Sequence, residues 1–361
     1  MEYKRLGEYI EPVDERNSKL EIKLSQGICN EKYFQDPRQV AENSAADKIV
    51  RRGYFAYNRA TTRNGEKISI AYREGPDCTV SSAYQVFRIK DEEKLNPKYL
   101  LMWYKRPDFD KYARFKSHGS AHEFFEYEEM CNVRIPLPSI ERQREIVLEY
   151  ETLTNRIRLN NQMIQHLEAT AQALYRKTFV DNIDKENLPE GWRMGTLSGL
   201  AVLKAGGDKP MDFSEIKTET YNVPVYANGI ENKGIFGYTT RPVIKAKSIT
   251  ISARGTIGYC FLRKEPYVPI VRLVVVAPHD EVMAQYLFYY LNASNIKGSG
   301  SVQSQLTVPD LEGREIKIPP KQMIQEFSDK VEIIDNSISL CEVENEILTE
   351  LQSLLLAKMG Q

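Results

Sequence analysis

Two short loops rich in glycine, serine and basic residues have the side chains best suited to hold a phosphate group. They are Lys116-Ser-His-Gly-Ser120 and Lys297-Gly-Ser-Gly-Ser301. Glycine lets a backbone approach closely, and N–H, hydroxyl and ammonium groups donate hydrogen bonds to phosphate oxygens. A helix C-cap followed by a turn uses the same residue types. Because the pattern occurs in both halves of the chain, we favour phosphate contacts by Lys116, Ser117, His118, Gly119, Ser120, Lys297, Ser299 and Ser301.

Two arginines in turn-like segments are candidates for contacts with base edges or phosphates. Arg254 lies in Ser252-Ala-Arg-Gly-Thr-Ile-Gly258, and Arg59 lies in the related but poorer Tyr57-Asn-Arg-Ala60. Arginine can bind guanine through two hydrogen bonds, although a surface salt bridge is the plainer interpretation of either residue. The predicted set of DNA contacts also includes Arg63, Lys204, Lys209 and Gln303.

Catalytic and cofactor motifs are missing from the sequence. The segment Gly229–Gly234 lacks the lysine that a phosphate-binding P-loop needs after its last glycine. His118 and His122 have no acidic or cysteine partner at metal-ligand spacing. We therefore predict no catalytic residue, no metal and no cofactor on this chain.

One short pattern keeps a nuclease hypothesis open. Asp310, Glu315 and Lys317 resemble the acidic and basic set of many nucleases. The spacing is short, the first half of the chain has no equivalent, and Lys317 falls in a predicted strand. A structural role is favoured, and a nuclease in its own right remains the alternative.

Two long helices are predicted to position these loops. Neither residues 139–180 nor the C-terminal stretch 321–358 contains glycine or proline, and Pro136-Leu-Pro-Ser139 supplies a stop and a helix N-cap before the first. Seam residues recur at spacings of three and four, as in coiled coils. In the first helix they are Ile146, Tyr150, Leu153, Ile157, Asn160, Ile164, Leu167 and Leu174. In the second they are Phe327, Val331, Ile334, Ile338, Cys341, Leu348 and Leu355.

The two helices are copies related by a shift of 181 residues, about half of the 361-residue chain. A proline step precedes each copy, and Gly119 and Gly300 keep the same spacing. The chain is therefore predicted to be one globular unit plus one long helix, written twice. The predicted parts are a first domain at 1–138, a spacer helix at 139–180, a second domain at 181–320 and a C-terminal helix at 321–361. An antiparallel pair would bring Asn345 near Arg156–Ile157.

Local patterns indicate mixed α and β structure in both globular parts. The Asn64-Gly65 step between two β-prone runs predicts a hairpin, and Pro97–Tyr104 predicts a short helix. In the second half, 248–253 and 271–277 are predicted strands, and the aromatic run Tyr286–Leu291 is a predicted helix.

Composition is that of an ordinary soluble protein, with 42% hydrophobic and 27% charged residues. No apolar run is long enough to span a membrane, the five cysteines form no C-x-x-C pair, and a cytoplasmic location is expected. The net charge is −1, but residues 321–361 carry −5 and residues 139–180 carry +1. The globular parts therefore carry +3, which permits DNA binding without proving it.

With these motifs in order and duplicated, the chain resembles the specificity subunit of type I restriction–modification systems along nearly its whole length. The parts that carry the resemblance are Ile251–Gly258, the small-residue turn Gly298–Ser301, and Ile135–Ile146 at the start of the first long helix.

The resemblance implies an α/β (α+β) fold in which two target-recognition domains are separated by two long helices that form an antiparallel coiled coil with pseudo-two-fold symmetry. It implies a non-catalytic DNA-binding subunit that reads a two-part target in double-stranded DNA and docks modification (methyltransferase) subunits on its helices. A restriction subunit is a further partner in this family. S-adenosylmethionine, Mg²⁺ and ATP are expected only on partner subunits. Two alternatives to this function remain. One is the nuclease in its own right, and the other is a coiled-coil scaffold without DNA contact.

Overall fold

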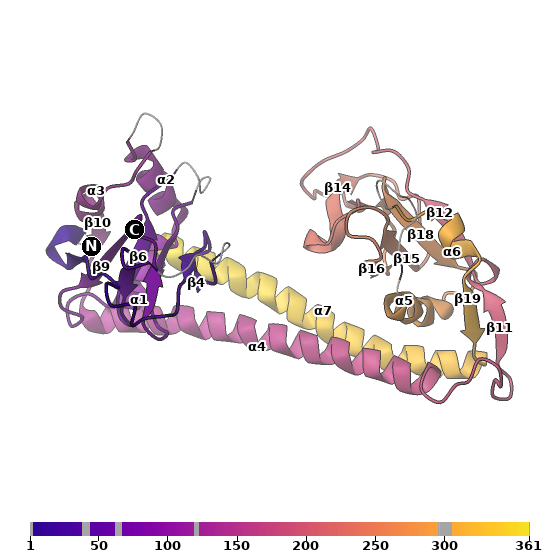
Figure 1. Ribbon diagram of the computed structural model, residues 1–361. Helices are drawn as coiled ribbons and strands as arrows, with labels where there is room; N and C mark the ends of the chain where they lie inside the picture. Colours follow the sequence, from indigo (N-terminus) through magenta and orange to yellow (C-terminus); the bar gives the residue numbers. More distant parts are fainter. Residues whose placement is uncertain are drawn as a thin grey trace. The chain divides into compact units, whose positions relative to one another are not determined.

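The computed structural model describes residues 3–37, 44–61, 67–118, 123–294, 296 and 305–360 (Figure 1). It divides into two compact units. Unit 1 comprises Met1–Asn161 with Glu342–Gln361, and unit 2 comprises Gln162–Cys341. Two long helices contribute segments to both units: α4 spans Ile140–Phe179 and α7 spans Lys321–Lys358. These bounds confirm the two long helices predicted from the uninterrupted apolar ladders.

Over its described residues, unit 1 is built from short strands and three short helices in addition to its segments of α4 and α7. Its strands are β1 Tyr3–Arg5, β2 Ile10–Val13, β3 Gly27–Ile28, β4 Phe34–Gln35, β5 Lys48–Val50, β6 Phe55–Asn58, β7 Ile70–Tyr72, β8 Cys78–Val80, β9 Tyr84–Ile89 and β10 Arg134–Pro136. Its other helices are the 3-10 turn η1 Leu6–Glu8, α1 Pro97–Tyr104, α2 Pro107–Phe115 and α3 Tyr127–Asn132. The predicted hairpin is present, because β6 and β7 pair antiparallel.

Unit 2 has a similar inventory. Its strands are β11 Arg193–Thr196, β12 Ala201–Ala205, β13 Val223–Tyr226, β14 Ile235–Thr239, β15 Ser248–Ser252, β16 Cys260–Arg263, β17 Val268–Pro269, β18 Leu273–Pro278 and β19 Glu315–Ile318. Its other helices are η2 Leu197–Gly199, η3 Glu231–Gly234, α5 Met283–Ala293 and α6 Pro309–Glu312. The strands predicted around 248–253 and 271–277, and the aromatic helix, are therefore confirmed within two or three residues.

The main sheets of the two units have the same topology. The strand order is β2-β9-β6-β7 in unit 1 and β12-β18-β15-β16 in unit 2, and every neighbouring pair is antiparallel. A second antiparallel pair joins the first strand of each unit to the strand just before a long helix, β1 with β10 and β11 with β19. The remaining strands differ, with β3-β4 and β5-β8 in unit 1 and β14-β13-β17 in unit 2. The internal repeat therefore covers the framework of each globular part.

The 181-residue shift does not hold throughout each copy. Met130 and Leu311, 181 apart, are both fully buried and occupy matching places before the last strand. At the start of each copy, Leu6 donates its N–H to the Val133 carbonyl and Leu197 donates to Arg314, at 2.8 and 3.0 Å. These two leucines are 191 residues apart, so loops of unequal length shift the strand numbering between the copies.

The polar stretch after Tyr104 contains a helix that the sequence pattern does not indicate. Helix α2 begins with Pro107 at its first position and buries only Phe109, Asp110 and Ala113. Three buried residues in nine are too few for an apolar period to stand out from the charged residues around them.

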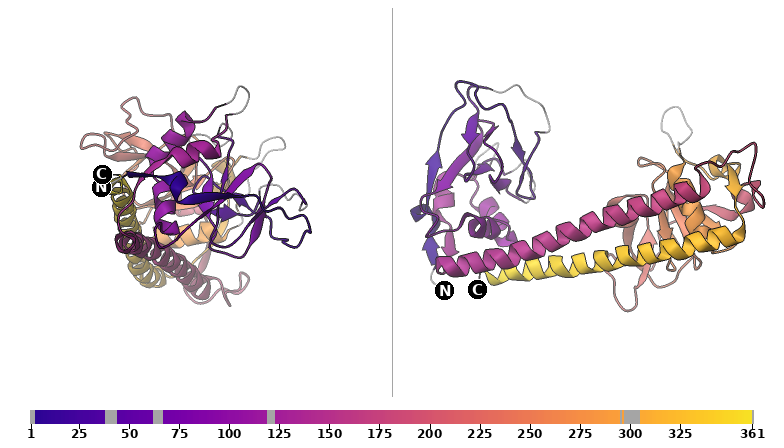
Figure 2. Two further views of the ribbon diagram at one scale, coloured as in Figure 1. Left: turned by 90° about the vertical axis from the view of Figure 1, so that its left-hand side faces the viewer. Right: turned by 90° about the horizontal axis from the view of Figure 1, so that it is seen from below.

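In unit 1, the segments of α4 and α7 lie side by side and antiparallel (Figures 1 and 2). The predicted seam residues of both helices are buried or half-buried. Asn160 donates to Glu344 Oε2 at 2.9 Å and to Asn345 Oδ1 at 3.1 Å, and Asn345 donates to Asn161 at 2.9 Å. Asn345 therefore lies about one helical turn from the predicted position beside Arg156–Ile157.

An ion pair completes this polar cluster. Arg156 donates two hydrogen bonds to the Glu344 carboxylate, at 2.8 and 3.0 Å. The bonds from Arg156, followed by that from Asn160, lower the pKa of Glu344. The apolar ladder alone tolerates more than one register, and this cluster of polar groups distinguishes among them.

The long helices also form part of the core of each unit. In unit 2, the Phe179 ring of α4 lies 5.1 Å from Phe327 of α7 and 4.9 Å from Tyr286 of α5. In unit 1, Ile146 of α4 and Met359 just after α7 join the core under the main sheet. The sheets are therefore packed onto the helix pair and are not independent of it.

We expect Phe327→Ala to lower the free energy of unfolding of unit 2 by about 3–5 kcal/mol, because Phe327 is 2% exposed and its removal leaves a cavity. Ile333→Ala on the same helix, where the side chain is 69% exposed, should change it by less than about 0.5 kcal/mol. Urea unfolding of the full chain, followed by Trp192 fluorescence in a Trp103→Phe background, measures both. Equal effects of the two variants would contradict the packing described here.

Candidate nucleic-acid interface

In unit 2, the turn that follows β15 is held in place by the side chain of Asn228. Its carboxamide oxygen accepts hydrogen bonds from the N–H groups of Ala253 and Arg254, at 2.9 and 3.2 Å. Its Nδ2 donates to the Arg254 carbonyl at 2.7 Å. Three hydrogen bonds to two consecutive residues fix the direction in which this turn leaves the sheet. Arg254, a predicted DNA contact, is therefore presented from an ordered backbone.

Two glycines allow the turn to take this shape. Gly255 and Gly258 have φ angles of +70° and +90°, in the left-handed region that favours glycine. A Cβ at Gly258 would also lie 3.1 Å from the carbonyl oxygen of Ile296. The backbone conformation of the turn thus requires glycine at these two positions of the Ser-Ala-Arg-Gly-Thr-Ile-Gly motif.

The other flank of the Arg254 turn is also held by backbone contacts. The Ala253 N–H also donates to the Arg272 carbonyl at 3.2 Å, and the Ala253 carbonyl accepts the N–H of Leu306 at 2.8 Å. Arg254 forms a β-bridge with Gln305. The side chain of Arg272 is exposed. Four further predicted contacts, Lys297, Ser299, Ser301 and Gln303, lie outside the described residues.

A second loop of unit 2, residues 228–234, is held close to the turn. Arg263, which is buried, donates to the Lys233 carbonyl at 2.7 Å and to Thr250 Oγ1 at 2.9 Å. Its guanidinium lies 3.5 Å from the Tyr226 ring centroid, and burial lowers its pKa. Arg263 thereby ties the loop to the sheet and leaves the Lys233 side chain exposed.

Two lysines that are predicted DNA contacts, Lys204 and Lys209, flank Gly206-Gly207 and lie in different surroundings. Lys204 is exposed on β12. The ammonium of Lys209 lies 3.6 Å from the Phe213 ring centroid and 5.2 Å from that of Phe236. Two aromatic faces restrict where this ammonium can lie, which reduces the entropy that Lys209 would lose on binding an anion.

In unit 1, Arg59 is engaged by protein groups. Its guanidinium lies 3.3 Å from the Glu126 carboxylate, and its Nε donates to the Ala83 carbonyl at 3.3 Å. The ion pair with Glu126 is a surface salt bridge, which was the plainer interpretation of Arg59 from the sequence.

The structure also corrects the alignment of Arg59 with Arg254. The Arg59 carbonyl accepts the N–H of Phe125, and in unit 2 the Ala253 carbonyl accepts the N–H of Leu306. Arg59 is thus the counterpart of Ala253. A one-residue difference in register puts the two arginines on opposite sides of their strands, because side chains alternate along a strand.

The basic loop of unit 1 is only partly described. Lys116 lies 3.7 Å from Glu129, and the Ser117 hydroxyl donates to the Ala113 carbonyl at 2.7 Å, which closes the end of α2. His118 exchanges backbone hydrogen bonds with Phe124. Arg63, Gly119 and Ser120 lie outside the described residues, as does His122. In this loop the cap interpretation holds for Ser117, and the phosphate contacts stay predictions.

The residues of the nuclease hypothesis each have a structural partner. Asp310 accepts hydrogen bonds from the N–H and the hydroxyl of Thr307, at 2.7 and 2.6 Å. Glu315 pairs with Lys185, and Lys317 donates to the Ile183 carbonyl at 2.5 Å. In the described ranges of the chain, no three histidine, cysteine or acidic side chains could together hold a metal ion. These contacts favour a role in supporting β19.

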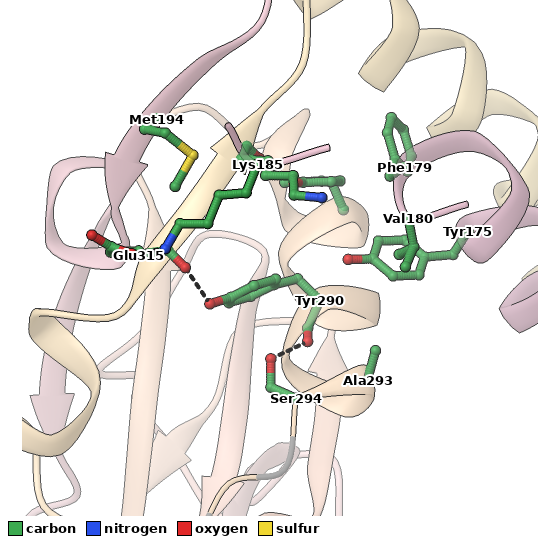
Figure 3. A pocket seen from close by; sticks show the side chains of 11 residues that line it. Tyr175, Phe179, Val180, Lys185, Met194, Tyr290, Ala293, Ser294 and Glu315 are labelled. Atoms are coloured by element: carbon green, nitrogen blue, oxygen red, sulfur yellow. Dashed lines mark hydrogen bonds and ion pairs between the residues drawn. The ribbon is translucent and has the colours of Figure 1, made fainter. Parts of the chain in front are cut away.

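A cavity of about 320 Å³ lies in unit 2 beside the end of α4 (Figure 3). Aromatic rings of Tyr175, Phe179 and Tyr290 form much of its wall. The Tyr290 hydroxyl donates to the Glu315 carbonyl at 2.9 Å, and the Ser294 hydroxyl donates to the Tyr290 carbonyl at 2.7 Å. Since these polar groups are already paired with protein groups, the cavity offers mainly an apolar surface.

Unit 1 has a buried arginine at a position that matches the cavity lining of unit 2. Tyr99 and Tyr286 are counterparts, since each donates its hydroxyl to the strand before a long helix. Counting seven residues on from these tyrosines, Arg106, just after α1, matches Ala293 at the end of α5. The Arg106 guanidinium is buried 4.2 Å from the Trp103 ring centroid. The two copies therefore differ in the side chain at this position.

Sequence reasoning missed the two residues that hold the Arg254 turn and the 228–234 loop in place. Asn228 bonds to Arg254, 26 positions away, and Arg263 bonds to Lys233, 30 positions away, so no local pattern marks them. In the described part of the chain, no helix is long and apolar enough to cross a membrane.

Comparison with known proteins gives a consistent assignment. The sequence profile of the type I restriction modification DNA specificity domain matches residues 45–169 and again 189–353. A Mycoplasma pneumoniae protein named as a type I specificity subunit is 29% identical over 281 residues, which cover 74% of this chain and 81% of that protein. The HindI type I specificity subunit of Haemophilus influenzae is 21% identical, and the match covers 87% of each chain.

Solved structures show the same fold. The S subunit of a type I restriction–modification system from M. genitalium matches with a TM-score of 0.63 at 14% identity, covering 100% of this chain and 96% of that one. A chain from a structure concerned with complex assembly of the type I system matches with a TM-score of 0.51 at 20% identity, covering 100% and 97%.

We expect Asn228→Ala to increase the hydrogen-exchange rate of the Arg254 amide by about tenfold or more, because its side-chain acceptor is removed. The Ala253 amide should change less, because it also donates to the Arg272 carbonyl. Asn222→Ala, an exposed site whose amide donates to the Glu219 carbonyl, is the matched control. Hydrogen exchange read by mass spectrometry with fragmentation measures both. Unchanged exchange in Asn228→Ala would show that the turn is held by other contacts.

Proposed function

The chain belongs to the type I restriction modification DNA specificity family, and we propose that it reads a two-part DNA target with its two units and docks methyltransferase subunits on its long helices. Recognition of a DNA sequence is the shared property of the family. The division of the target between the units, the docking of partners and the residues involved belong to the proposal.

The duplicated main sheet is the observation that supports a two-part target most strongly. Both units have the same strand order, and both attach it to the helix pair in the same way. The segments between the shared strands differ in length and in structure, as with β3-β4 in unit 1 and β14-β13-β17 in unit 2. A common scaffold with different loops is the arrangement expected of two binding domains with different targets.

In unit 2, we infer that the Arg254 turn and the 228–234 loop face DNA. The backbone of Arg254 is fixed by Asn228, while Lys233 of the 228–234 loop and Arg272, whose carbonyl accepts from Ala253, are exposed cations. Ordered arginine and lysine side chains can contact base edges and phosphates with little loss of entropy. Lys204 and Lys209 would add phosphate contacts, and Lys297, Ser299, Ser301 and Gln303 are proposed contacts outside the described residues.

In unit 1, the proposed DNA contacts depend on rearrangement of existing ion pairs. Arg59 would have to leave Glu126, and Lys116 would have to leave Glu129. These exposed pairs are weak, so a phosphate can compete for either cation. His118 and, outside the described residues, Arg63, Gly119 and Ser120 complete the proposed set, while the Ser117 hydroxyl stays with its helix.

The helix pair would set the distance between the two parts of the target. The seam of α4 from Ile146 to Leu174 is about 42 Å long at about 1.5 Å per residue, comparable with one turn of DNA at about 34–36 Å. The chain would leave base modification and cleavage to partner subunits. S-adenosylmethionine, Mg²⁺ and ATP would accordingly bind to those partners.

A second apolar stripe on α7 is the proposed docking face. Ile333, Leu340, Ile347 and Leu354 recur every seven residues, and their side chains are 54 to 71% exposed. Val343 and Leu351 widen this stripe. At about 100° per residue the stripe lies roughly a third of a turn from the seam, so a partner helix can pack on it while α4 stays in place. Exposed apolar residues in such a row are typical of a protein-binding surface.

We expect that exchanging residues 188–320 for the corresponding domain of another specificity subunit changes one half of the recognised sequence and leaves the other half intact. The physical reason is that each sheet carries its own loops. Sequencing of methylated sites in cells that carry the hybrid measures the outcome. A change in both halves would contradict the division of the target between units.

We expect Ile347→Glu to weaken assembly with the modification subunits at least tenfold, because it places a charge in the proposed apolar contact. Thr349→Glu adds the same charge on the opposite side of α7 and should leave assembly unchanged. Analytical ultracentrifugation of the mixed subunits measures both, and circular dichroism checks that the helices are retained. Equal assembly by the two variants would move the docking face elsewhere.

A further inference from the structure

Unit 1 contains a lysine-rich cavity that the proposed DNA contacts do not use. Its volume is about 440 Å³, and its wall includes four lysines, Lys32, Lys67, Lys105 and Lys111, against two acidic residues, Glu31 and Asp110. The lining therefore has a surplus of two positive charges at neutral pH. A volume of this size accommodates a small organic ligand.

Two of the four lysines are neutralised by the acidic residues. Lys32 Nζ lies 2.5 Å from Asp110, and both side chains are buried. Lys67 Nζ lies 2.8 Å from Glu31 at the exposed side of the cavity. These pairs account for both carboxylates of the lining, so the positive surplus resides on Lys105 and Lys111.

Lys105 is a half-buried cation without a carboxylate of its own. Among the described residues, its ammonium forms no ion pair, and it lies 5.1 Å from the Tyr150 ring centroid. Burial lowers its pKa, and Glu74 and Glu151 offset only part of that effect. Both of these carboxylates are already bridged by Lys98. An anion near Lys105 would supply the missing counter-charge.

The shared fold does not require this cluster. By the correspondence of Tyr99 with Tyr286, the counterpart of Lys105 in unit 2 is Asn292, which donates to the Phe288 carbonyl at 3.1 Å. The 181-residue shift of the helices makes Val331 the counterpart of Tyr150. At the matching positions, unit 2 therefore has a short amide and an aliphatic side chain. The desolvated lysine over an aromatic ring is particular to unit 1.

We propose that this cavity binds the phosphate group of a small phosphorylated molecule, with Lys105 and Lys111 as donors and the Tyr150 ring as one wall. A phosphate monoester carries about two negative charges at neutral pH, which matches the surplus on the lining. Lysine ammonium groups are common phosphate ligands. The ring of Tyr150 and the side chains of Pro107 and Leu356 give an apolar surface for the rest of the ligand.

The test is a titration of the full chain with inorganic phosphate, pyrophosphate and ADP, followed by calorimetry and by phosphorus NMR. Saturable binding of at least one probe is expected. Binding should be about tenfold weaker in Lys105→Met, which keeps the side-chain length on Tyr150, and in Lys111→Gln, because each loses a charge-assisted hydrogen bond. Lys94→Gln, at an exposed lysine paired with Asp91, is the matched control and should bind as the unmodified chain does.

Comparison of the probes distinguishes a nucleotide from free phosphate, and comparison of the variants shows whether the site exists. ADP binding at least tenfold more tightly than inorganic phosphate identifies a nucleotide ligand, and equal affinities identify free phosphate; both support the site. Lys111 is exposed, so Lys111→Gln remains informative if Lys105→Met does not fold. Absence of saturable binding, or equal affinities in Lys111→Gln and Lys94→Gln, would overturn it. A loss of affinity in the lysine variants that appears only for target DNA would also overturn the proposed phosphate site.

Discussion

The polar cluster between α4 and α7 in unit 1 determines how the two long helices pair. Asn160 is only 5% exposed, and its amide donates to Glu344 and Asn345, while Arg156 binds the same carboxylate twice. A slip by one heptad would preserve most apolar contacts of the ladder. It would leave the Asn160 amide buried without these partners, at a cost of about 1–3 kcal/mol. Apolar packing supplies the stability of the pair, and the polar cluster supplies its register.

The globular parts depend on that register because each core includes side chains from both helices. In unit 2, Phe179 and Phe327 contact each other and Tyr286 or Tyr289 under the main sheet. A slip of one heptad moves a helix by about 10 Å relative to its partner, more than the width of a side chain. Phe179 and Phe327 would then lose their contact. The placement of the Arg254 turn above this sheet therefore depends on how the helices pair.

The long helices could be predicted from the sequence because forty positions without glycine or proline leave few alternatives to a helix. Several strands and the aromatic helix were also predictable from local patterns. The alignment of Arg59 with Arg254 between the two copies was wrong by one residue, because the sequence similarity of Tyr57–Ala60 to the Arg254 motif does not determine the strand register. Asn228 and Arg263 could not be predicted, because their roles depend on contacts between distant loops. Polar anchors of this kind become visible only when the fold brings their partners together.

Two copies of one scaffold with different loops suit a protein that reads two different short sequences. If each unit reads one of them, the methylated target consists of two specified blocks separated by a gap of fixed length. Methylation-sensitive sequencing of DNA from cells that carry this chain with its modification subunits tests that consequence directly. We expect one two-part motif with a constant unspecified gap. A single contiguous motif, or two blocks with a variable gap, would contradict it.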